Sequence, residues 1–434
     1  MRIYQLLRGL AQQHRVTCLS FAADQAAADA LNVLSNIVDV QVVLGPAVRS
    51  TARRAITTIA SMQPDMALRN QSQTYSAALS ELLQKQRFDI VQAESIEMAP
   101  YLLDMMRSGI LQSGAQLSRN PGNPRHGAQR SRVNSGDSSA YQKPLLVLDQ
   151  FNVEYMLQKR AALTSLNNAI TASMRPMARV RHGTGAVYSL AQWFKLKRYE
   201  RQALRQLPAI VAVSNEDAQV FRQLYPQAGI SIVPNGVDTT VFSRAALAQR
   251  LEPVLKRPSI VFSGTLDFRA NIDAVLWLAE QVLPIVRQRY PELDCVVVGK
   301  RPAAALQELA QTGILQLTGE VSDARPYIAE AAVYVVPMRI GGGVRLKLLE
   351  ALALEAALVS TSMGAEGIQG LRHNRHCLIA DRPQDFAAAI IQVLEQPEQA
   401  RRMGVAGREL MCEAYDWQHI VPKLEKLYTA ALEG

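Results

Sequence analysis

The sequence predicts an α/β protein with parallel, doubly wound sheets covered by helices on both faces. Apolar runs of strand length alternate with amphipathic helical runs along the second half of the chain. A weaker form of the same alternation extends through the first half. Because the chain has 434 residues and is 48% hydrophobic, it is long enough for two such domains, each with its own core.

In the second half, strand and helix candidates follow one another in order. Residues 259–266, SIVFSGTL, read as an apolar strand that closes on a glycine, and residues 271–290 have the apolar spacing of an amphipathic helix. Further buried strands are expected at DCVVVG, ILQLTGEV and AAVYVVP. Gly264 and Gly319 stand at strand ends, where ligands of such sheets bind, although a plain turn is the alternative for each.

The first half contains weaker strand candidates separated by helices. These apolar runs are residues 16–22, 38–44, 88–94, 144–150 and 208–214. The opening residues, MRIYQLLRGLAQQHRV, read as an amphipathic helix that runs directly into the first of these strands. Residues 112–143 are rich in Ser, Gly, Asn, Arg and Pro and have almost no apolar side chains, so we expect a disordered insertion there.

Composition and charge exclude several classes of protein. The four cysteines have neither Cys-x-x-Cys nor histidine spacing, no run of eighteen apolar residues occurs, and no secretion signal opens the chain. This pattern favours a cytoplasmic protein. The net charge of +9 is compatible with an anionic substrate, with peripheral contact at the inner face of a membrane, or simply with solubility. No nucleic-acid-binding motif accompanies the charge, and no metal-ligand spacing is found.

The most informative segment is residues 338–361, MRIGGGVRLKLLEALALEAALVST. Gly341, Gly342 and Gly343 would let backbone N–H groups turn toward an anion, and the helix expected to start near Val344 would add the positive end of its dipole. Arg345 and Lys347 follow in the first turn, and Glu350 lies deeper, where a carboxylate would accept hydrogen bonds from vicinal hydroxyls. A glycine-rich turn with a solvated basic face is the alternative.

This segment resembles the nucleotide-sugar motif of family-four (group 1) glycosyltransferases, in the branch that reads GGG-x-R-x-K-x-LE. The resemblance implies that Arg345 and Lys347 hold the donor diphosphate and that Glu350 holds the ribose hydroxyls. It also places Arg269 and Asn271, in the loop after Gly264, at the diphosphate. The runs IVAVSNED and ISIVPNGVD, and the C-terminal helix WQHIVPKLEKLYTAAL, resemble the same family.

A second segment that resembles the family is LDQFNVEY, residues 148–155. Relatives often read Asp-x-His-Asn-Val-Glu there, facing the acceptor. This chain keeps Asp149, Asn152 and Glu154 but has Phe151 at the histidine position, so the obvious side-chain base is missing. Retaining transfer in the family is described as front-face, with the departing phosphate assisting deprotonation of the acceptor. Helix capping is the alternative role for Glu154.

The resemblance implies the GT-B architecture, with two facing Rossmann-like domains. We expect an acceptor-side domain over residues 1–245, a nucleotide-sugar-binding domain over 256–412, and a crossover helix over 413–434 that returns to the first domain. Members of the family have a strand and a Gly-rich loop before the helix that opens this chain. We therefore expect the first strand of the N-terminal domain to be missing from this chain.

The expected function is retaining transfer of a sugar from a nucleoside-diphosphate sugar to a hydroxyl of a glycan or lipid-linked acceptor, without a cofactor or a metal. Such a reaction would belong to polysaccharide or glycolipid synthesis. Two alternatives stay open at this point. One is a nucleotide-sugar epimerase of the same fold, and the other is a catalytically silent protein that binds a nucleotide sugar.

Overall fold

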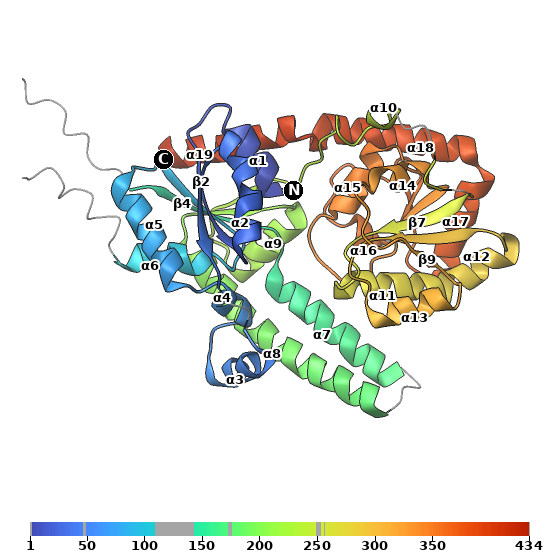
Figure 1. Ribbon diagram of the computed structural model, residues 1–434, viewed down its shortest axis with the longest axis horizontal. Helices are drawn as coiled ribbons and strands as arrows, with labels where there is room; N and C mark the ends of the chain where they lie inside the picture. The colour runs from blue at the N-terminus through green and yellow to red at the C-terminus, as the bar shows by residue number, and fades with distance from the viewer. Residues whose placement is uncertain are drawn as a thin grey trace, which may run out of the picture.

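The computed structural model describes residues 2–46, 49–108, 143–171, 176–248, 253–255 and 257–433. Two lobes lie side by side, each built around a parallel β-sheet with helices packed against it (Figure 1). Except for Lys143, the expected insertion at 112–143 lies outside the described residues. None of the helices in the described ranges is both long and apolar enough to cross a bilayer.

The C-terminal lobe contains a parallel sheet of six strands in the order β12-β11-β10-β7-β8-β9. The strands are β7 (Ser259–Ser263), β8 (Asp294–Val298), β9 (Gln316–Leu317), β10 (Val333–Val336), β11 (Leu358–Ser360) and β12 (Leu378–Ile379). The chain builds outward from β7 to β9 and then returns to place β10 on the other side of β7. The order of winding therefore reverses between β7 and β10, and ligands of doubly wound sheets bind at such a switch point.

Helices cover both faces of this sheet. They are α11 (Arg269–Trp277), α12 (Leu283–Arg289), α13 (Ala304–Gln311), α14 (Arg325–Glu330), α15 (Leu346–Ala353), α16 (Ser362–Ala365), α17 (Pro383–Glu395) and α18 (Pro397–Leu410). Single π-helical turns join α11 to α12 at Leu278–Val282 and follow α18 at Met411–Tyr415. The strands and helices form one continuous core whose sheet residues are almost completely buried.

The N-terminal lobe contains two separate parallel sheets. The larger has the order β3-β4-β5-β6, with β3 (Ile90–Glu94), β4 (Leu145–Gln150), β5 (Ala209–Ala212) and β6 (Ile230–Ile232). The smaller pairs β1 (Thr17–Ala22) with β2 (Asp39–Leu44). A small cavity of about 130 Å³ has Thr17 and Leu19 of β1 on one side and Ile90 and Val91 of β3 on the other.

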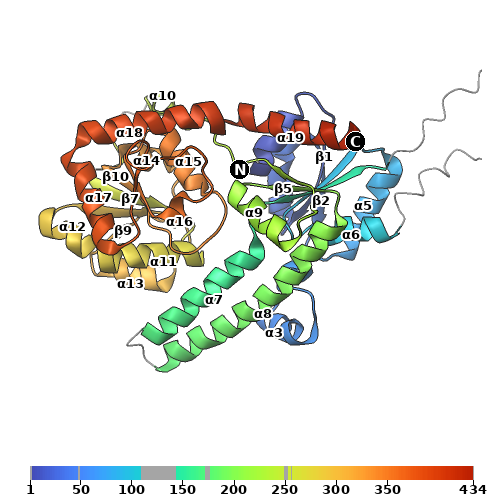
Figure 2. The ribbon, with the colours of Figure 1, turned by 180° about the vertical axis from the view of Figure 1, so that it is seen from behind.

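Short helices complete this lobe, and two long helices extend from it. The short ones are α1 (Arg2–Leu10), α2 (Gln25–Leu31), a 3₁₀ turn (Asn32–Asn36), α3 (Thr51–Ala60), α4 (Asp65–Arg69), α5 (Gln73–Lys85), α6 (Ala99–Ser108), α9 (Asn215–Leu224) and α10 (Arg244–Leu247). The long helices α7 (Glu154–Thr171) and α8 (Pro176–Gln206) pack side by side and project away from both sheets (Figures 1 and 2). We call this pair the arm.

The last helix, α19 (Trp417–Glu433), leaves the C-terminal lobe and packs on the N-terminal one (Figure 2). Its apolar face joins α1 and the larger N-terminal sheet in a core of their own, which includes Leu6, Val147 and Leu424. Gly9 permits the close approach of α1 to α19, because a Cβ there would overlap the side chain of Val421. Burying a leucine or isoleucine side chain in such a contact contributes about 1.5–3 kcal/mol.

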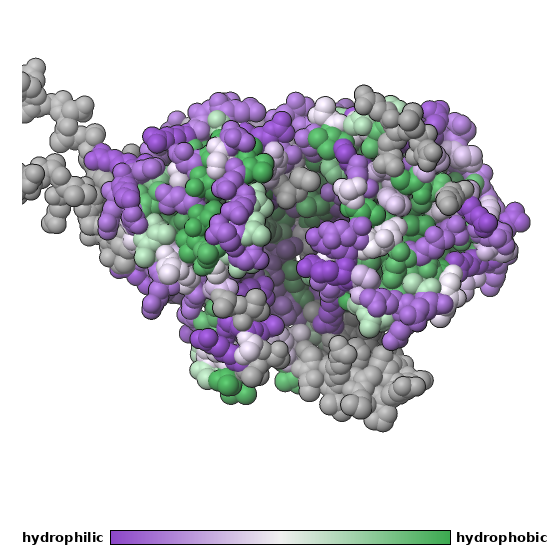
Figure 3. Space-filling view, viewed as in Figure 1, coloured by the Kyte–Doolittle hydropathy of each residue, from purple (hydrophilic) through white to green (hydrophobic). Residues whose placement is uncertain are grey.

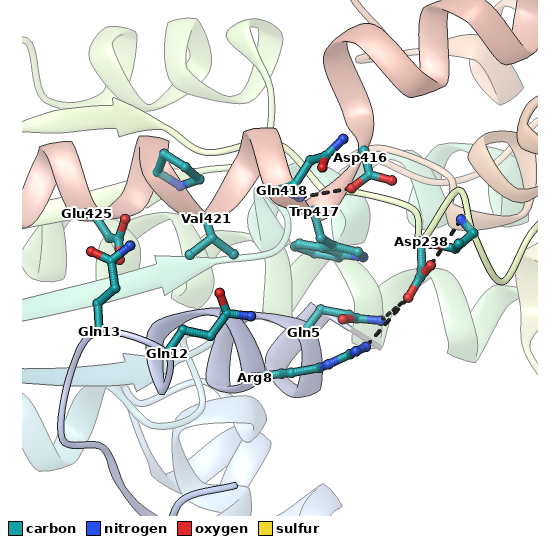
Figure 4. A pocket seen from close by; sticks show the side chains of 13 residues that line it. Gln5, Arg8, Gln12, Gln13, Asp238, Asp416, Trp417, Gln418, Val421 and Glu425 are labelled. Atoms are coloured by element: carbon teal, nitrogen blue, oxygen red, sulfur yellow. Dashed lines mark hydrogen bonds and ion pairs between the residues drawn. The ribbon is translucent and has the colours of Figure 1, made fainter.

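The chain crosses between the lobes twice, and the two crossings are bonded together. Val237 donates its backbone N–H to Tyr415 O at 2.8 Å, and the Asp416 carboxylate accepts from the backbone and side chain of Thr239. Beside them lies a polar cavity of about 330 Å³ between α1 and α19, where Gln5 and Arg8 point toward Asp238 (Figure 4). This cavity lies apart from the glycine-rich loop that follows β10.

The structure confirms the predicted α/β class, with doubly wound parallel sheets in two lobes. Each apolar run proposed as a strand contains one, although the bounds are shorter than the runs. Two helix starts were wrong. α15 begins at Leu346 with Arg345 as its N-cap, two residues after the expected start near Val344, and α11 begins at Arg269, two residues before the expected start at 271, so Arg269 lies on a helix rather than in a loop. The sequence analysis also did not single out β12, whose two residues are too few for a periodic pattern.

Candidate functional site

The candidate site lies at the switch point of the C-terminal sheet. Gly264 directly follows β7, and the loop that contains the three glycines follows β10, its neighbour. The helices after these two strands, α11 and α15, begin close together, because Lys347 on α15 reaches Asn271 on α11. The space-filling view shows a groove between the two lobes with hydrophilic residues along its walls (Figure 3).

Two of the three glycines, Gly341 and Gly343, adopt a backbone path that other residues could not follow. Gly341 and Gly343 have φ of 141° and 68°, values that L side chains rarely adopt. A Cβ at Gly341 would overlap the guanidinium of Arg345, and a Cβ at Gly343 would lie 2.5 Å from Asn152 Oδ1. Close packing on both sides and backbone conformation therefore both require glycine in this loop.

Arg345 is a largely buried cation, and two of its guanidinium nitrogens have no direct partner among the described residues. Its Nη1 donates to Gly342 O, whereas its Nε and Nη2 are buried and have no hydrogen-bond partner within the described ranges. It forms no ion pair with a carboxylate of the described residues, and burial lowers its pKa. Buried donors without partners are rare and costly, so these two nitrogens indicate a missing acceptor, most simply an anionic ligand.

Lys347 is a second buried cation, two residues further along the chain. Its Nζ donates to Asn271 Oδ1 at 2.9 Å and lies 4.0 Å from the centre of the Phe262 ring. Asn271 donates its own amide N–H to Thr265 O at 2.8 Å, which turns its oxygen toward the lysine. Burial, assisted by the charge of Arg345, lowers the pKa of Lys347 to about 7. No carboxylate in the described part of the chain forms an ion pair with this ammonium either.

Glu350 lies three residues beyond Lys347 on α15. Burial raises the pKa of this carboxyl, and the charge of Lys347 opposes the rise. No described residue donates a hydrogen bond to its side chain, so both oxygens are available to a ligand. Arg269 is the first residue of α11, two positions before Asn271, and partial burial lowers its pKa.

Glycines also follow the three neighbouring strands β7, β8 and β9: Gly264 and Gly299 come directly after β7 and β8, and Gly319 comes two residues after β9. A Cβ at Gly264 would lie 2.8 Å from both the Lys347 ammonium and the Asn271 amide. Gly319 has φ of 73°, and a Cβ there would face open space. Between them lies Gly299, which the sequence analysis missed, although it follows an apolar strand as Gly264 does. A Cβ at Gly299 would overlap Gly264 O.

The N-terminal lobe contributes residues 151–154 to the same site. Asn152 lies against the glycine loop, and in the amide orientation that satisfies both of its polar atoms it donates to Gly342 O at 3.0 Å. In the other orientation it donates to Glu154 Oε1 at 3.4 Å. Burial raises the pKa of Glu154 to about 7. The structure thus brings Asn152 to the glycine loop, with Glu154 behind it, whereas Asp149 is completely buried and paired with Arg2 at 2.9 Å.

Two further residues at this junction were not found from the sequence. Arg160 on α7 donates to Gly341 O and forms a two-pronged ion pair with Glu366, which follows α16. Arg160 belongs to the arm, and Glu366 belongs to the C-terminal lobe. No local motif marks either residue, because their role depends on a contact between positions 206 residues apart.

Comparison with known proteins identifies the family that two parts of the chain match. Residues 257–396 match the family model for glycosyl transferases group 1, and residues 160–241 match the model for glycosyltransferase family 4. The alpha-maltose-1-phosphate synthase of Mycolicibacterium smegmatis is 26% identical over 277 residues, which cover 59% of this chain and 70% of that protein. A phosphatidyl-myo-inositol mannosyltransferase of Propionibacterium freudenreichii is 26% identical over 310 residues, which cover 69% and 76% respectively.

Solved structures support the architecture. A glycosyltransferase from Rickettsia africae ESF-5 superposes with a TM-score of 0.62 at 12% identity, over 100% of this chain and 94% of the other. At that identity the likeness shows the fold alone, which is GT-B. Together, the family models and the fold support a group 1, family-four glycosyltransferase, as the glycine-loop motif predicted. The chain is therefore a glycosyltransferase.

Proposed function

We propose that this protein transfers a hexose, with retention of configuration, from a nucleoside-diphosphate sugar to a hydroxyl of a glycan or lipid-linked acceptor. The C-terminal lobe, residues 256–412, would hold the donor. The N-terminal lobe, residues 1–245, would present the acceptor across the groove. The observation that carries the proposal is the pair of cations at the start of α15, Arg345 and Lys347. Neither forms a direct ion pair with a carboxylate of the described residues.

A diphosphate would give both cations a direct anionic partner. The Nε and Nη2 of Arg345 would donate to its oxygens, and the Lys347 ammonium would supply a second charge. The backbone N–H groups of Gly341, Gly342 and Gly343 and the N-terminal end of the α15 dipole would add partial positive charge. An anion there would also stabilise the charged form of Lys347, whose pKa is lowered to about 7 by burial.

We assign the other residues of the site to the remaining parts of the nucleotide sugar. We assign the ribose hydroxyls to the Glu350 carboxylate, whose oxygens accept no hydrogen bond from the described side chains. Asn271 holds Lys347 in position, and Arg269 on the same turn of α11 adds positive charge. Gly319 leaves open backbone for the nucleotide to approach, and Gly264 makes room for the Lys347 and Asn271 side chains.

The reaction requires that negative charge on the diphosphate be stabilised as its bond to the sugar breaks. The bond between the anomeric carbon and the diphosphate oxygen cleaves, and a bond to the acceptor oxygen forms on the same face of the sugar. The acceptor proton passes to the departing phosphate oxygen, so no histidine is needed where Phe151 stands. Arg345, Lys347 and the helix dipole would stabilise the charge that develops on the diphosphate. We expect turnover to persist in the presence of a chelator.

The acceptor side is polar and lies at the lobe junction. Asn152 would position the acceptor hydroxyl or the transferred sugar, because it lies beside the glycine loop, and Glu154 would act next to it, within hydrogen-bond reach of its amide. One relative is named as a mannosyltransferase that acts on phosphatidyl-myo-inositol, which favours a lipid-linked acceptor for this chain as well.

An exposed apolar surface offers a route to such an acceptor. Ile56 and Ile59 on α3 and Val187, Leu190 and Phe194 on α8 are exposed, and hydrogen bonds from the α8 side chains Gln192 and Lys195 to Thr58 hold the two helices together. The exposed cations Arg53 and Lys197 lie on the same helices. We propose peripheral contact with anionic lipid through this surface, at the cytoplasmic face of a membrane.

A transfer assay tests the proposed function. Purified protein would be incubated with UDP-glucose, GDP-mannose or ADP-glucose and a lipid extract as acceptor. Release of nucleoside diphosphate that depends on the extract is expected, and the anomeric proton coupling of the product should match that of the donor. Nucleotide release without an acceptor, or a product of inverted configuration, would contradict the proposal. Flotation with vesicles containing phosphatidylglycerol tests the membrane contact.

A further inference from the structure

Arg160 bonds the arm to the donor loop, and Leu157 on the same helix lies beside Gly342. Arg160 lies on α7 in the N-terminal lobe, and its Nη1 donates to the backbone oxygen of Gly341 and to Glu366 Oε2, the latter at 2.8 Å. Its Nη2 donates to Glu366 Oε1 at 2.9 Å. The two side chains are 29% and 26% exposed, so this ion pair lies at the edge of the lobe junction rather than in a core.

The bond to Gly341 O determines the orientation of one peptide group. In a trans peptide the C=O of Gly341 and the N–H of Gly342 point in opposite directions. When Arg160 holds the oxygen on the side of the arm, the N–H of Gly342 must point away from the arm. The next oxygen, that of Gly342, is held in the same way by Arg345 Nη1.

Glu366 orients the guanidinium that makes this bond. A bidentate carboxylate fixes the plane of an arginine, which then places its donors at defined angles. Glu366 also lies close enough to Arg345 to favour its charged form, whereas Arg160 disfavours it. The pair therefore adds little net charge beside Arg345, so its effect on a donor should come mainly from geometry.

We propose that Arg160 is a positioning residue for the donor: held by Glu366, it fixes the Gly341–Gly342 peptide so that the loop N–H groups face the diphosphate. This inference rests on the proposed function of the glycine loop. It also assigns a purpose to the arm, which brings α7 to the donor loop and so links the lobe that takes the acceptor to the lobe that takes the donor.

The test compares donor KM and kcat among five variants, with the nucleotide sugar that binds the wild-type protein most tightly. Arg160→Ala should raise the donor KM about tenfold, while its melting temperature stays close to that of wild type, because partly exposed ion pairs contribute little stability. Arg160→Lys should recover only a small part of the loss, since an ammonium cannot form the fork. Arg401→Ala, which removes an arginine from an exposed ion pair on α18, is the matched control and should leave KM unchanged.

Glu366→Gln separates positioning from direct phosphate binding. If Arg160 acts through the loop, loss of the fork loosens the guanidinium and the donor KM rises, by about threefold. If Arg160 instead binds phosphate, neutralising its competitor frees it and the donor KM falls, which would overturn the proposal. A lower melting temperature with unchanged KM in Arg160→Ala would also overturn it. Lys347→Ala tests the proposed diphosphate site separately from the role of Arg160. Retained donor affinity in that variant would contradict the diphosphate site itself.

Discussion

Donor binding should depend on pH through Lys347. Burial, with a smaller contribution from Arg345, lowers the pKa of this ammonium to about 7. A diphosphate beside it favours the charged form and raises the pKa. Binding should therefore take up a proton wherever the free protein has already lost it, and donor affinity should fall as the pH rises above 7.

The size of the effect follows from linkage. At pH 7 roughly half of the free protein has a neutral Lys347, so binding should take up about half a proton. At higher pH the protonated fraction falls about tenfold per unit, and the donor dissociation constant should rise by the same factor until the pKa of the complex is reached.

Calorimetric titration with a nucleotide sugar between pH 6 and pH 9 measures this dependence, and buffers of different ionisation enthalpy report the proton uptake directly. A nucleotide sugar is preferable to a free nucleoside diphosphate, whose terminal phosphate itself titrates near neutral pH. Lys347→Arg is the control, since its guanidinium stays charged and its binding should not vary with pH through this position. A flat wild-type profile, with no proton uptake at pH 8, would refute the reasoning.

Three other substitutions test the rest of the site. Arg345→Ala should weaken nucleotide-sugar binding by about 1.5–3 kcal/mol, measured by calorimetry, and unchanged affinity would exclude a phosphate contact. Glu350→Gln should retain the fold and lower kcat/KM by about 10- to 100-fold through the ribose, and wild-type kinetics would remove its assigned role. Gly299→Ala should destabilise the protein by at least about 2 kcal/mol in urea unfolding, because the added Cβ would overlap Gly264 O; an unchanged midpoint would mean that the two strand ends can separate.

The part of the site that is continuous in sequence could be predicted without the structure. Gly341, Arg345, Lys347 and Glu350 lie within ten residues, and the geometry of a strand, a loop and a helix places them at one helix N-terminus. The fold class was readable for a similar reason, since the alternation of apolar strands and amphipathic helices is a local pattern. The helix start was two residues off because Arg345 caps α15 instead of belonging to it.

Contacts between distant segments were decided only by the tertiary structure. The sequence suggested Asn152 through a resemblance but could not show that it lies against Gly343, and it gave no sign that Arg160 reaches Gly341. Gly299 carried the same local signal as Gly264, yet its importance comes from the backbone of a neighbouring strand. The amino-acid sequence by itself determined the candidate donor loop and the α/β class, because backbone geometry over a few residues fixes both. The junction with the arm depends on how the lobes pack, which no local pattern encodes.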